Sequence, residues 1–273
     1  MYSSDLKQFT AANCERMLSD VTITASADKK KYTQADDAAA TSNRVEDSGK
    51  AIPLTVLWNS SLLGKLRSLS VSLAEERRLP SELSQWVQFG GQEVRDFWDR
   101  HPELRNTEWV ECDYSEVAAA LVGLQLSHPA RQKTFLELGC GFGVVAGTAS
   151  LLGFEAVGIE SERFLVEEAI RIAAVYGIKS AEFWEGNFLP TGAAQFAEEE
   201  DPRVALKSEA ESVYAKYGRD IAEFGTIFAY PWPGEEHFLK SVFRNYAAAG
   251  ARLVLYRGPF QIEIYEKLPT ESR

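Results

Sequence analysis

The sequence has few of the residues that build metal sites and disulfide frameworks, and it has no long apolar run. Its 273 residues include three histidines and three cysteines, and the spacing of Cys14, Cys112 and Cys140 matches neither a metal site nor a disulfide framework. An odd number of cysteines suits a reducing compartment. No apolar run approaches the roughly 18–20 residues that cross a bilayer, and no secretory signal is visible at the start. We therefore expect a soluble, cytoplasmic protein without a metal centre.

Basic residues are in the minority as well. Lysine and arginine number 29 and aspartate and glutamate 40, which gives a formal net charge of -11. A protein that coats nucleic acid needs a basic surface to displace the counterions of the phosphate backbone. The charge therefore disfavours nucleic acid and favours a small molecule or a cationic partner.

Composition divides the chain into three parts. Residues 1–50 are rich in Ala, Ser, Thr, Asp and Lys and offer little apolar surface to bury, which predicts a disordered tail. Residues 51–129 carry apolar residues at mostly helical spacing and are predicted to form a helical extension. Residues 130–273 alternate strand and helix patterns, which predicts parallel βαβ units and a ligand-binding domain.

Helices are predicted at several places in the extension. Apolar residues recur at mostly helical spacing over residues 54–73 and 94–98, and Asp113 with Glu116 resembles a capping box before another helix. We expect these helices to cover the pocket of the following domain and to help select its substrate. The aromatic residues of the extension are more typical of a core than of a ligand site: Trp86, Phe89, Phe97, Trp98 and Trp109.

Five short apolar strands are predicted from residue 134 onwards, separated by helical or turn segments. Strands that alternate with helices indicate an α/β fold with a doubly wound, mostly parallel sheet and helices on both faces. The predicted strands are residues 134–138, 155–160, 181–185, 225–230 and 251–256, with helices over 144–152 and 164–176 and one further strand over 261–266.

Three glycines follow the first of these strands. Ligands of doubly wound sheets bind at the carboxyl ends of the strands, where Gly139, Gly141 and Gly143 lie. Glycine there allows a positive φ and a close approach of the backbone to a ligand, and the following helix start supplies amides. Glu160 ends the second strand about 20 residues further on, where a carboxylate can accept both hydroxyls of a ribose.

Two details separate this loop from a dinucleotide site. The dinucleotide fingerprint spaces its glycines as G-x-G-x-x-G, whereas here the third glycine comes one residue early and Val144 takes its place. Glu137 also lies on the strand two residues before the first glycine, where it would repel a pyrophosphate. A ligand with an ammonium and a sulfonium group would instead gain from that carboxylate.

The sequence around the glycines resembles class I S-adenosylmethionine (SAM)-dependent methyltransferases. Residues 135–143 are similar to their motif I, in which an acidic residue precedes a G-x-G-x-G loop, and residues 157–160 are similar to the acidic end of their second strand. Residues 185–188 resemble their third-strand turn, where Gly-Asp is common and Asn187 here replaces the Asp. An asparagine oxygen can still accept a hydrogen bond from the adenine amino group.

This resemblance extends over residues 113 to 268, and it is greatest to uncharacterised bacterial members of the class. It implies a Rossmann-like fold with SAM as the cofactor, the methionine part over the glycine loop, the ribose on Glu160 and the adenine near Asn187 and Phe188. Glu137 is expected to orient the loop and the methionine amine. The implied cofactor-binding residues are Glu137, Gly139, Cys140, Gly141, Gly143, Glu160, Asn187 and Phe188.

The turn after the fourth strand is expected to face the methyl group. Prolines cannot continue a central strand, so the chain must leave the sheet at Tyr230. Tyr230 and Trp232 are then placed either to stack near the sulfonium, worth about 0.5–2 kcal/mol for a cation over a ring, or to pack the turn. Glu235 and Glu236 could act as a general base or bind a cationic substrate, or they could be solvated acidic residues that favour a helix start. The catalytic candidates are Tyr230, Trp232 and Glu235.

The same turn departs from two methyltransferase groups that act on nucleic acid or on amides. Adenine and glutamine-amide N-methyltransferases carry Asp/Asn-Pro-Pro-aromatic, and tRNA guanine methyltransferases carry Asp-Pro-Trp-Pro before basic residues, whereas this chain has Tyr230 first and Glu235-Glu236 after. We therefore expect methyl transfer to an unidentified acceptor, a small molecule or a protein rather than nucleic acid. The alternatives are an RNA methyltransferase, a SAM-binding module without catalysis, and a nicotinamide enzyme.

Overall fold

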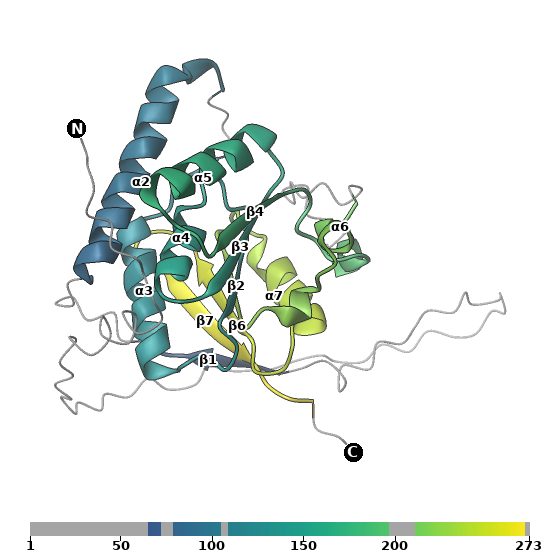
Figure 1. Ribbon diagram of the computed structural model, residues 1–273. Helices are drawn as coiled ribbons and strands as arrows, with labels where there is room; N and C mark the ends of the chain where they lie inside the picture. The colour runs from purple at the N-terminus through teal and green to yellow at the C-terminus, as the bar shows by residue number, and fades with distance from the viewer. Residues whose placement is uncertain (1–64, 72–78, 105–108, 197–210, 271–273) are drawn as a thin grey trace, which may run out of the picture.

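The computed structural model describes residues 65–71, 79–104, 109–196 and 211–270 (Figure 1). The predicted disordered tail, residues 1–50, and the apolar residues from Leu54 to Leu63 lie outside this part of the chain. Strands and helices alternate from residue 134 onwards and form one sheet with helices on both faces. The predicted doubly wound α/β fold is therefore confirmed.

The sheet has seven strands in the order β1-β7-β6-β5-β2-β3-β4. The five strands from β6 to β4 in this order run parallel, and β7 runs antiparallel to its neighbours β6 and β1. The strands are β1 (Leu66–Leu69), β2 (Thr134–Leu138), β3 (Glu155–Glu160), β4 (Ala181–Glu185), β5 (Thr226–Ala229), β6 (Arg252–Tyr256) and β7 (Ile262–Lys267).

Helices lie in two layers, with α2 to α5 on one side of the sheet and α6 and α7 on the other (Figure 1). Short 3-10 turns follow α2, β4 and α6 at Pro102–Leu104, Ala193–Phe196 and Ile221–Glu223. The α-helices are α2 (Ser81–Arg100), α3 (Tyr114–Ser127), α4 (Val144–Leu151), α5 (Arg163–Tyr176), α6 (Val213–Tyr217) and α7 (Glu236–Tyr246).

The central strands are buried on both faces. Successive side chains of a strand point to opposite faces, so Leu136 packs in the core with α6 and α7 while its neighbour Phe135 packs in the core with α3 and α4. Ile227 and Phe228 of β5 divide in the same way. Burial on both faces is typical of parallel strands. It fixes β2, β3 and β5 side by side, so that their carboxyl ends lie together along one side of the sheet, which we call the carboxyl edge.

The helical prediction for residues 54–73 is wrong where it can be checked. Leu66 and Leu69 belong to β1, which pairs antiparallel with the outer side of β7. Residues three apart in a strand point to opposite faces, and accordingly Leu66 packs on the core of α7 while Leu69 packs on the core of α3. Pairing with an otherwise open sheet edge outweighs the local helical spacing. The prediction of helices later in the extension is confirmed by α2 and by α3, which Asp113 caps.

Glycines let α2 approach α4 closely. The ideal Cβ of Gly147 on α4 would lie 2.2 Å from the ring of Trp86 on α2, and that of Gly90 on α2 would lie 2.9 Å from Val144. The indole Nε1 of Trp86 donates to the Val144 carbonyl at 2.9 Å, within the first turn of α4. The extension is thereby fixed to the helix that follows the glycine loop.

We expect Gly147→Ala to lower the free energy of unfolding by about 1–3 kcal/mol, because the added methyl group overpacks the contact with Trp86. Gly91→Ala is the matched control, since this glycine is also helical and its Cβ would meet the flexible end of Arg95 at 3.3 Å. The control gains helix propensity of up to about 1 kcal/mol and should be neutral or stabilising. Urea denaturation measures both, and equal stabilities for the two variants would contradict the contact.

Candidate cofactor and acceptor site

The glycine loop between β2 and α4 takes a conformation that requires glycine. Gly139, Gly141 and Gly143 have φ values of 72°, 51° and 70°, in the left-handed region where an L side chain is strained. The amides of Gly139 and Cys140 both donate to the Ile159 carbonyl, at 2.9 and 2.8 Å. The loop is therefore tied to the neighbouring strand β3 at its first two residues.

Glu160, the last residue of β3, holds the middle of this loop. Its Oε2 accepts a hydrogen bond from the Gly141 amide at 3.0 Å, and its Oε1 accepts from the amides of Ser161 and Glu162 at 2.7 and 3.0 Å. Oε1 also accepts from the Ser161 hydroxyl at 3.3 Å, whereas Oε2 accepts a single bond, from Gly141, and keeps one acceptor position for a further donor such as a ribose hydroxyl. Glu160 thus joins the loop to the start of α5.

Glu137 is buried on β2 beneath the start of α4. Its Oε2 accepts from the Ala146 amide at 2.8 Å, and the residue is only 4% exposed. Burial raises the pKa of this carboxyl well above its usual range, the Ala146 bond lowers it, and the charge of Glu160 raises it further. The contact fits the expected role in orienting the loop, because it fixes the helix start that the loop leads into.

Cys140 lies beneath the loop rather than on its surface. Its side chain packs against Gly158 of β3, whose ideal Cβ would lie 2.8 Å from the sulfur, and its thiol contacts the Gly141 carbonyl at 3.8 Å. Burial, with the charges of Glu137 and Glu160, raises the pKa of this thiol well above its usual range. The amide of Cys140 donates to β3 and its side chain packs beneath the loop. The sequence alone cannot distinguish such a packing residue from one that contacts a ligand.

The turn after β4 comes next to Glu160. The amide of Gly186 donates to the Glu160 carbonyl at 2.9 Å, and the side-chain Oδ1 of Asn187 accepts from the Leu189 amide at 2.9 Å. Phe188 is half-buried and packs on the core that faces α7. The structure thus brings Asn187 and Phe188 to the same sheet edge as the glycine loop, and the amide oxygen of Asn187 already shapes its own turn.

The aromatic turn after β5 is closed by its own acidic residue. The Oε2 of Glu235 accepts from the Trp232 amide at 3.1 Å, and the Glu235 amide donates to the Trp232 carbonyl at 3.0 Å. Glu235 is 4% exposed, whereas Trp232 is 38% exposed. Tyr230 packs edge-on against Tyr256 at the end of β6, with ring centroids 4.9 Å apart. Trp232 therefore faces solvent, while Tyr230 is partly packed.

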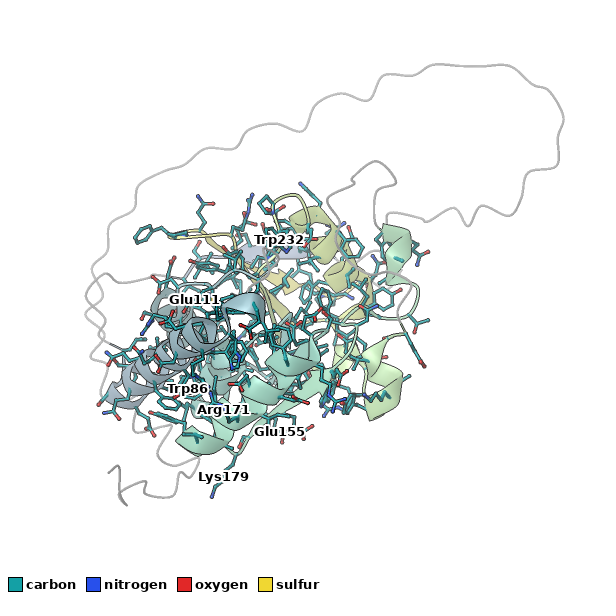
Figure 2. All side chains as sticks on the ribbon, turned by 90° about the horizontal axis from the view of Figure 1, so that it is seen from above. Trp86, Glu111, Glu155, Arg171, Lys179 and Trp232 are labelled. Carbon is teal, nitrogen blue, oxygen red and sulfur yellow. The ribbon has the colours of Figure 1, made fainter. Side chains whose placement is uncertain are left out.

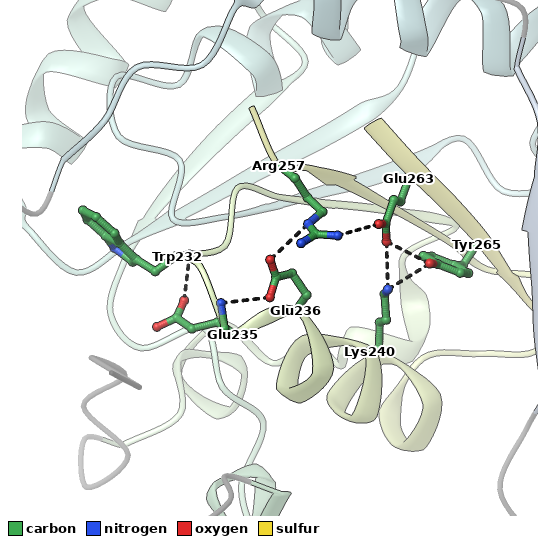
Figure 3. Close-up of polar contacts among 8 residues, drawn as sticks. Trp232, Glu235, Glu236, Lys240, Arg257, Glu263 and Tyr265 are labelled. Atoms are coloured by element: carbon green, nitrogen blue, oxygen red, sulfur yellow. Dashed lines mark hydrogen bonds and ion pairs between the residues drawn. The ribbon is translucent and has the colours of Figure 1, made fainter. Parts of the chain in front are cut away.

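An ion-pair network fixes this turn to β6 and β7 (Figure 3). Glu236 accepts from the Gly234 amide and from Nε of Arg257, both at 3.0 Å. Arg257 reaches Glu263 at 2.9 Å, and Glu263 also accepts from Nζ of Lys240 at 2.8 Å. Both acidic residues of the turn thus hold its backbone. Arg257, Lys240 and Glu263 were not predicted, because each comes from a different element and none carries a local signal.

Residues 109–113 of the extension cross the same sheet edge. Trp109 contacts the glycine loop, since the ideal Cβ of Gly141 would lie 2.5 Å from its Nε1. The Asp113 amide donates to the hydroxyl of Tyr256 at 3.2 Å. Burial raises the pKa of Cys112 well above its usual range, and the charge of Glu137 adds to the rise. This segment therefore runs from the glycine loop to the end of β6.

Other features of the described residues lie apart from this edge or offer no site. A groove of about 380 Å³ lies between α5 and the edge strand β4, lined by Ile170, Phe183 and Tyr217 among others, and no predicted site residue lines it. Within residues 65–71, 79–104, 109–196 and 211–270, no cluster of three His, Cys, Asp or Glu side chains could hold a metal ion. No helix in the same ranges is long and apolar enough to cross a membrane.

Comparison with known proteins finds likeness at the level of structure. No family model and no curated protein matches the sequence. An RNA methyltransferase from Salinibacter ruber, solved in complex with S-adenosyl-L-homocysteine (SAH), is 18% identical with a TM-score of 0.36, over 55% of this chain and 90% of that chain. The SAH-bound methyltransferase PaMTH1 from Podospora anserina is 13% identical with a TM-score of 0.39, over 66% and 64%. The YcgJ protein from Bacillus subtilis is 16% identical with a TM-score of 0.33, over 51% and 49%.

The chain spans less than two thirds of the second and third of these structures, and likeness this distant concerns the fold alone. Five parallel strands carry a glycine loop after the first and an acidic residue at the end of the second. Beyond the last parallel strand β6, the antiparallel strand β7 follows, and β1, from earlier in the chain, pairs with its outer side.

We expect the network around Glu263 to stabilise the protein in a pH-dependent way. Burial alone would raise the pKa of Glu263, but hydrogen bonds from Lys240, Arg257 and Tyr265 outweigh it and lower the pKa from 4.5 to about 2. A carboxyl group whose pKa is lowered by folding stabilises the folded state at pH values above its ordinary pKa of 4.5. This stabilisation is lost as pH falls through the lowered pKa of about 2. The difference in free energy of unfolding between wild type and Glu263→Gln should therefore stay constant from neutral pH down to about 4.5 and narrow as pH falls from there to about 2.

Chemical denaturation at a series of pH values measures this difference. Glu155→Gln is the control for loss of one surface carboxylate, because Glu155 is exposed at the start of β3 and lies on the opposite side of the molecule from Trp232 (Figure 2). A difference for Glu263→Gln that does not narrow between pH 4.5 and about 2 would contradict the assigned network.

Proposed function

We propose that this chain is a class I SAM-dependent methyltransferase that acts on a small molecule or a protein. The observation that carries the proposal is the pair of carboxylates around the glycine loop. Glu160 binds the amide of Gly141 in the loop, and Glu137 binds the amide of Ala146 in the helix behind it. Both acidic residues are thus built into the place where a doubly wound sheet binds its ligand.

The charge of this place favours SAM over a dinucleotide. Glu137 and Glu160 are close enough for their charges to interact, and both are at least nine-tenths buried. A pyrophosphate brought to this loop would add negative charge to a poorly solvated negative site, which costs energy. SAM carries an ammonium and a sulfonium group, so its charge complements the site. The net charge of -11 likewise supports an acceptor other than nucleic acid.

Each candidate residue takes a role that its contacts permit. Glu160 would hold the ribose through the remaining acceptor position of its Oε2, and Asn187 and Phe188 would flank the adenine. Gly139, whose ideal Cβ would meet nothing within 4 Å, leaves room for the methionine part. When bound, SAM supplies an electrophilic methyl group. Methyl transfer to a good nucleophile depends mainly on proximity and alignment.

The acceptor would lie beside the turn from Tyr230 to Glu236. Trp232 offers an exposed aromatic surface there, and Tyr230 stands at the point where β5 ends. The carboxylate of Glu235 accepts a hydrogen bond from the Trp232 amide. This contact supports a role for Glu235 in positioning the turn rather than as a general base. A SAM-binding module without catalysis shares every contact on the cofactor side, and turnover with labelled SAM distinguishes it.

Isothermal titration with SAM, SAH and NAD is the first test. We expect the wild type to bind SAM and SAH in preference to NAD. Glu160→Ala should weaken both about ten- to a hundredfold, because hydrogen bonds to a charged acceptor contribute about 1.5–3 kcal/mol. Glu155→Ala, at the opposite end of the same strand, should bind like the wild type.

Two results would count against the proposal. Wild type that binds neither SAM nor SAH would remove the cofactor assignment. Equal weakening by Glu155→Ala would show that the Glu160 effect reflects loss of the strand rather than loss of a ligand contact, and circular dichroism of both variants checks this directly.

Glu137→Gln is expected to change stability and binding in opposite directions. Glutamine can still accept the Ala146 hydrogen bond but carries no charge to bury. Because the pKa of Glu137 is raised by burial, its ionised form costs stability increasingly as pH rises, so the variant should unfold at higher denaturant concentration at neutral and alkaline pH. SAM binding should weaken, because an ammonium group nearby favours the ionised form of Glu137 and glutamine cannot supply that charge. A variant that binds SAM as tightly as the wild type would refute this role.

A further inference from the structure

We propose that Trp109, from the extension, is a wall of the cofactor site, so that the Rossmann-like domain completes its pocket with a side chain from outside itself. This inference rests on the proposed function. By its sequence context, Trp109 is more typical of a core aromatic residue than of a ligand site. Its contacts instead set it against the glycine loop.

The first argument is the position of the indole. Its Nε1 would lie 2.5 Å from a Cβ on Gly141, so the ring occupies the space that a side chain of the central loop glycine would fill. The amide of that same glycine donates to Glu160, the residue assigned to the ribose. Trp109 therefore lies beside Gly141, which is hydrogen-bonded to the proposed ribose ligand Glu160.

The second argument is that the ring is supported from behind. Trp109 packs edge-on against Phe142 of the loop, with centroids 5.2 Å apart, and in a tilted contact against Trp98 of α2 at 5.4 Å. Phe142 and Trp98 are fully packed, at 1% and 4% exposure, whereas Trp109 is half-buried. A rigid aromatic platform with one side still accessible is suited to cover a ligand.

The third argument is that the segment continues towards the acceptor side. The Asp113 amide binds the hydroxyl of Tyr256, whose ring packs against Tyr230. Residues 109–113 thus join the glycine loop to the ends of β5 and β6. A wall in this place excludes water from both the cofactor and the approaching acceptor, and an indole ring gains from facing a cationic group.

The test combines tryptophan emission with calorimetry on the full chain, using SAH and SAM as probes. We expect SAH to change the emission of the wild type, and this change to be largely lost in Trp109→Phe, which keeps an aromatic ring. Trp109→Ala should weaken SAM binding about tenfold, in line with loss of a ring beside a cation. Trp184→Phe is the matched control, because Trp184 stacks on Tyr217 at the β4 edge and should leave affinity unchanged.

Each outcome decides the assignment. Wild type that binds SAH while Trp109→Ala binds equally well, or a Trp109→Phe that keeps the full emission change, would overturn the role of Trp109 and leave the proposed function intact. Wild type that binds no SAH would overturn both together. Thermal unfolding of the two variants separates the expected result from a folding defect, since Trp109→Phe should unfold with the wild type.

Discussion

The hydrogen bond from the Gly141 amide to the Glu160 carboxylate is the contact on which the site depends. It links the loop after β2 to the end of β3, and the same carboxylate also binds the amides of Ser161 and Glu162 just before α5. One side chain therefore sets the relative position of a loop, a strand end and a helix start. Because the strands beneath are buried on both faces, the loop has a rigid support.

The extension is part of this arrangement. Trp86 and Gly147 bring α2 against α4, and residues 109–113 then run across the sheet edge from Trp109 at the loop to Asp113 at Tyr256. The sheet is completed by the extension too, since β1 pairs with β7. Helices, strand and connecting segment of the extension thus each stabilise a different side of the α/β domain.

The turn after β5 is held by charge rather than by glycine. Glu236, Arg257 and Glu263 form a continuous chain of ion pairs from the turn to β7, with Lys240 of α7 joined at its end. Pairs with one partly buried partner keep more of their strength than fully exposed pairs, and a forked guanidinium fixes direction as well as distance. This leaves Trp232 exposed on a turn that cannot easily change shape.

Local patterns determined much of this protein. Gly139 to Gly143, Glu160 and the strand–helix alternation could be predicted because their signals are close in sequence and their geometry follows from one βαβ unit. Tertiary structure decided the rest. Leu66 and Leu69 have helical spacing but form a strand because they pair with β7. Arg257 forms ion pairs with carboxylates of two other elements. Trp109 differs from a core residue by its contact with Gly141. These are pairings between residues far apart in the chain, and no local spacing encodes which partners folding will bring together.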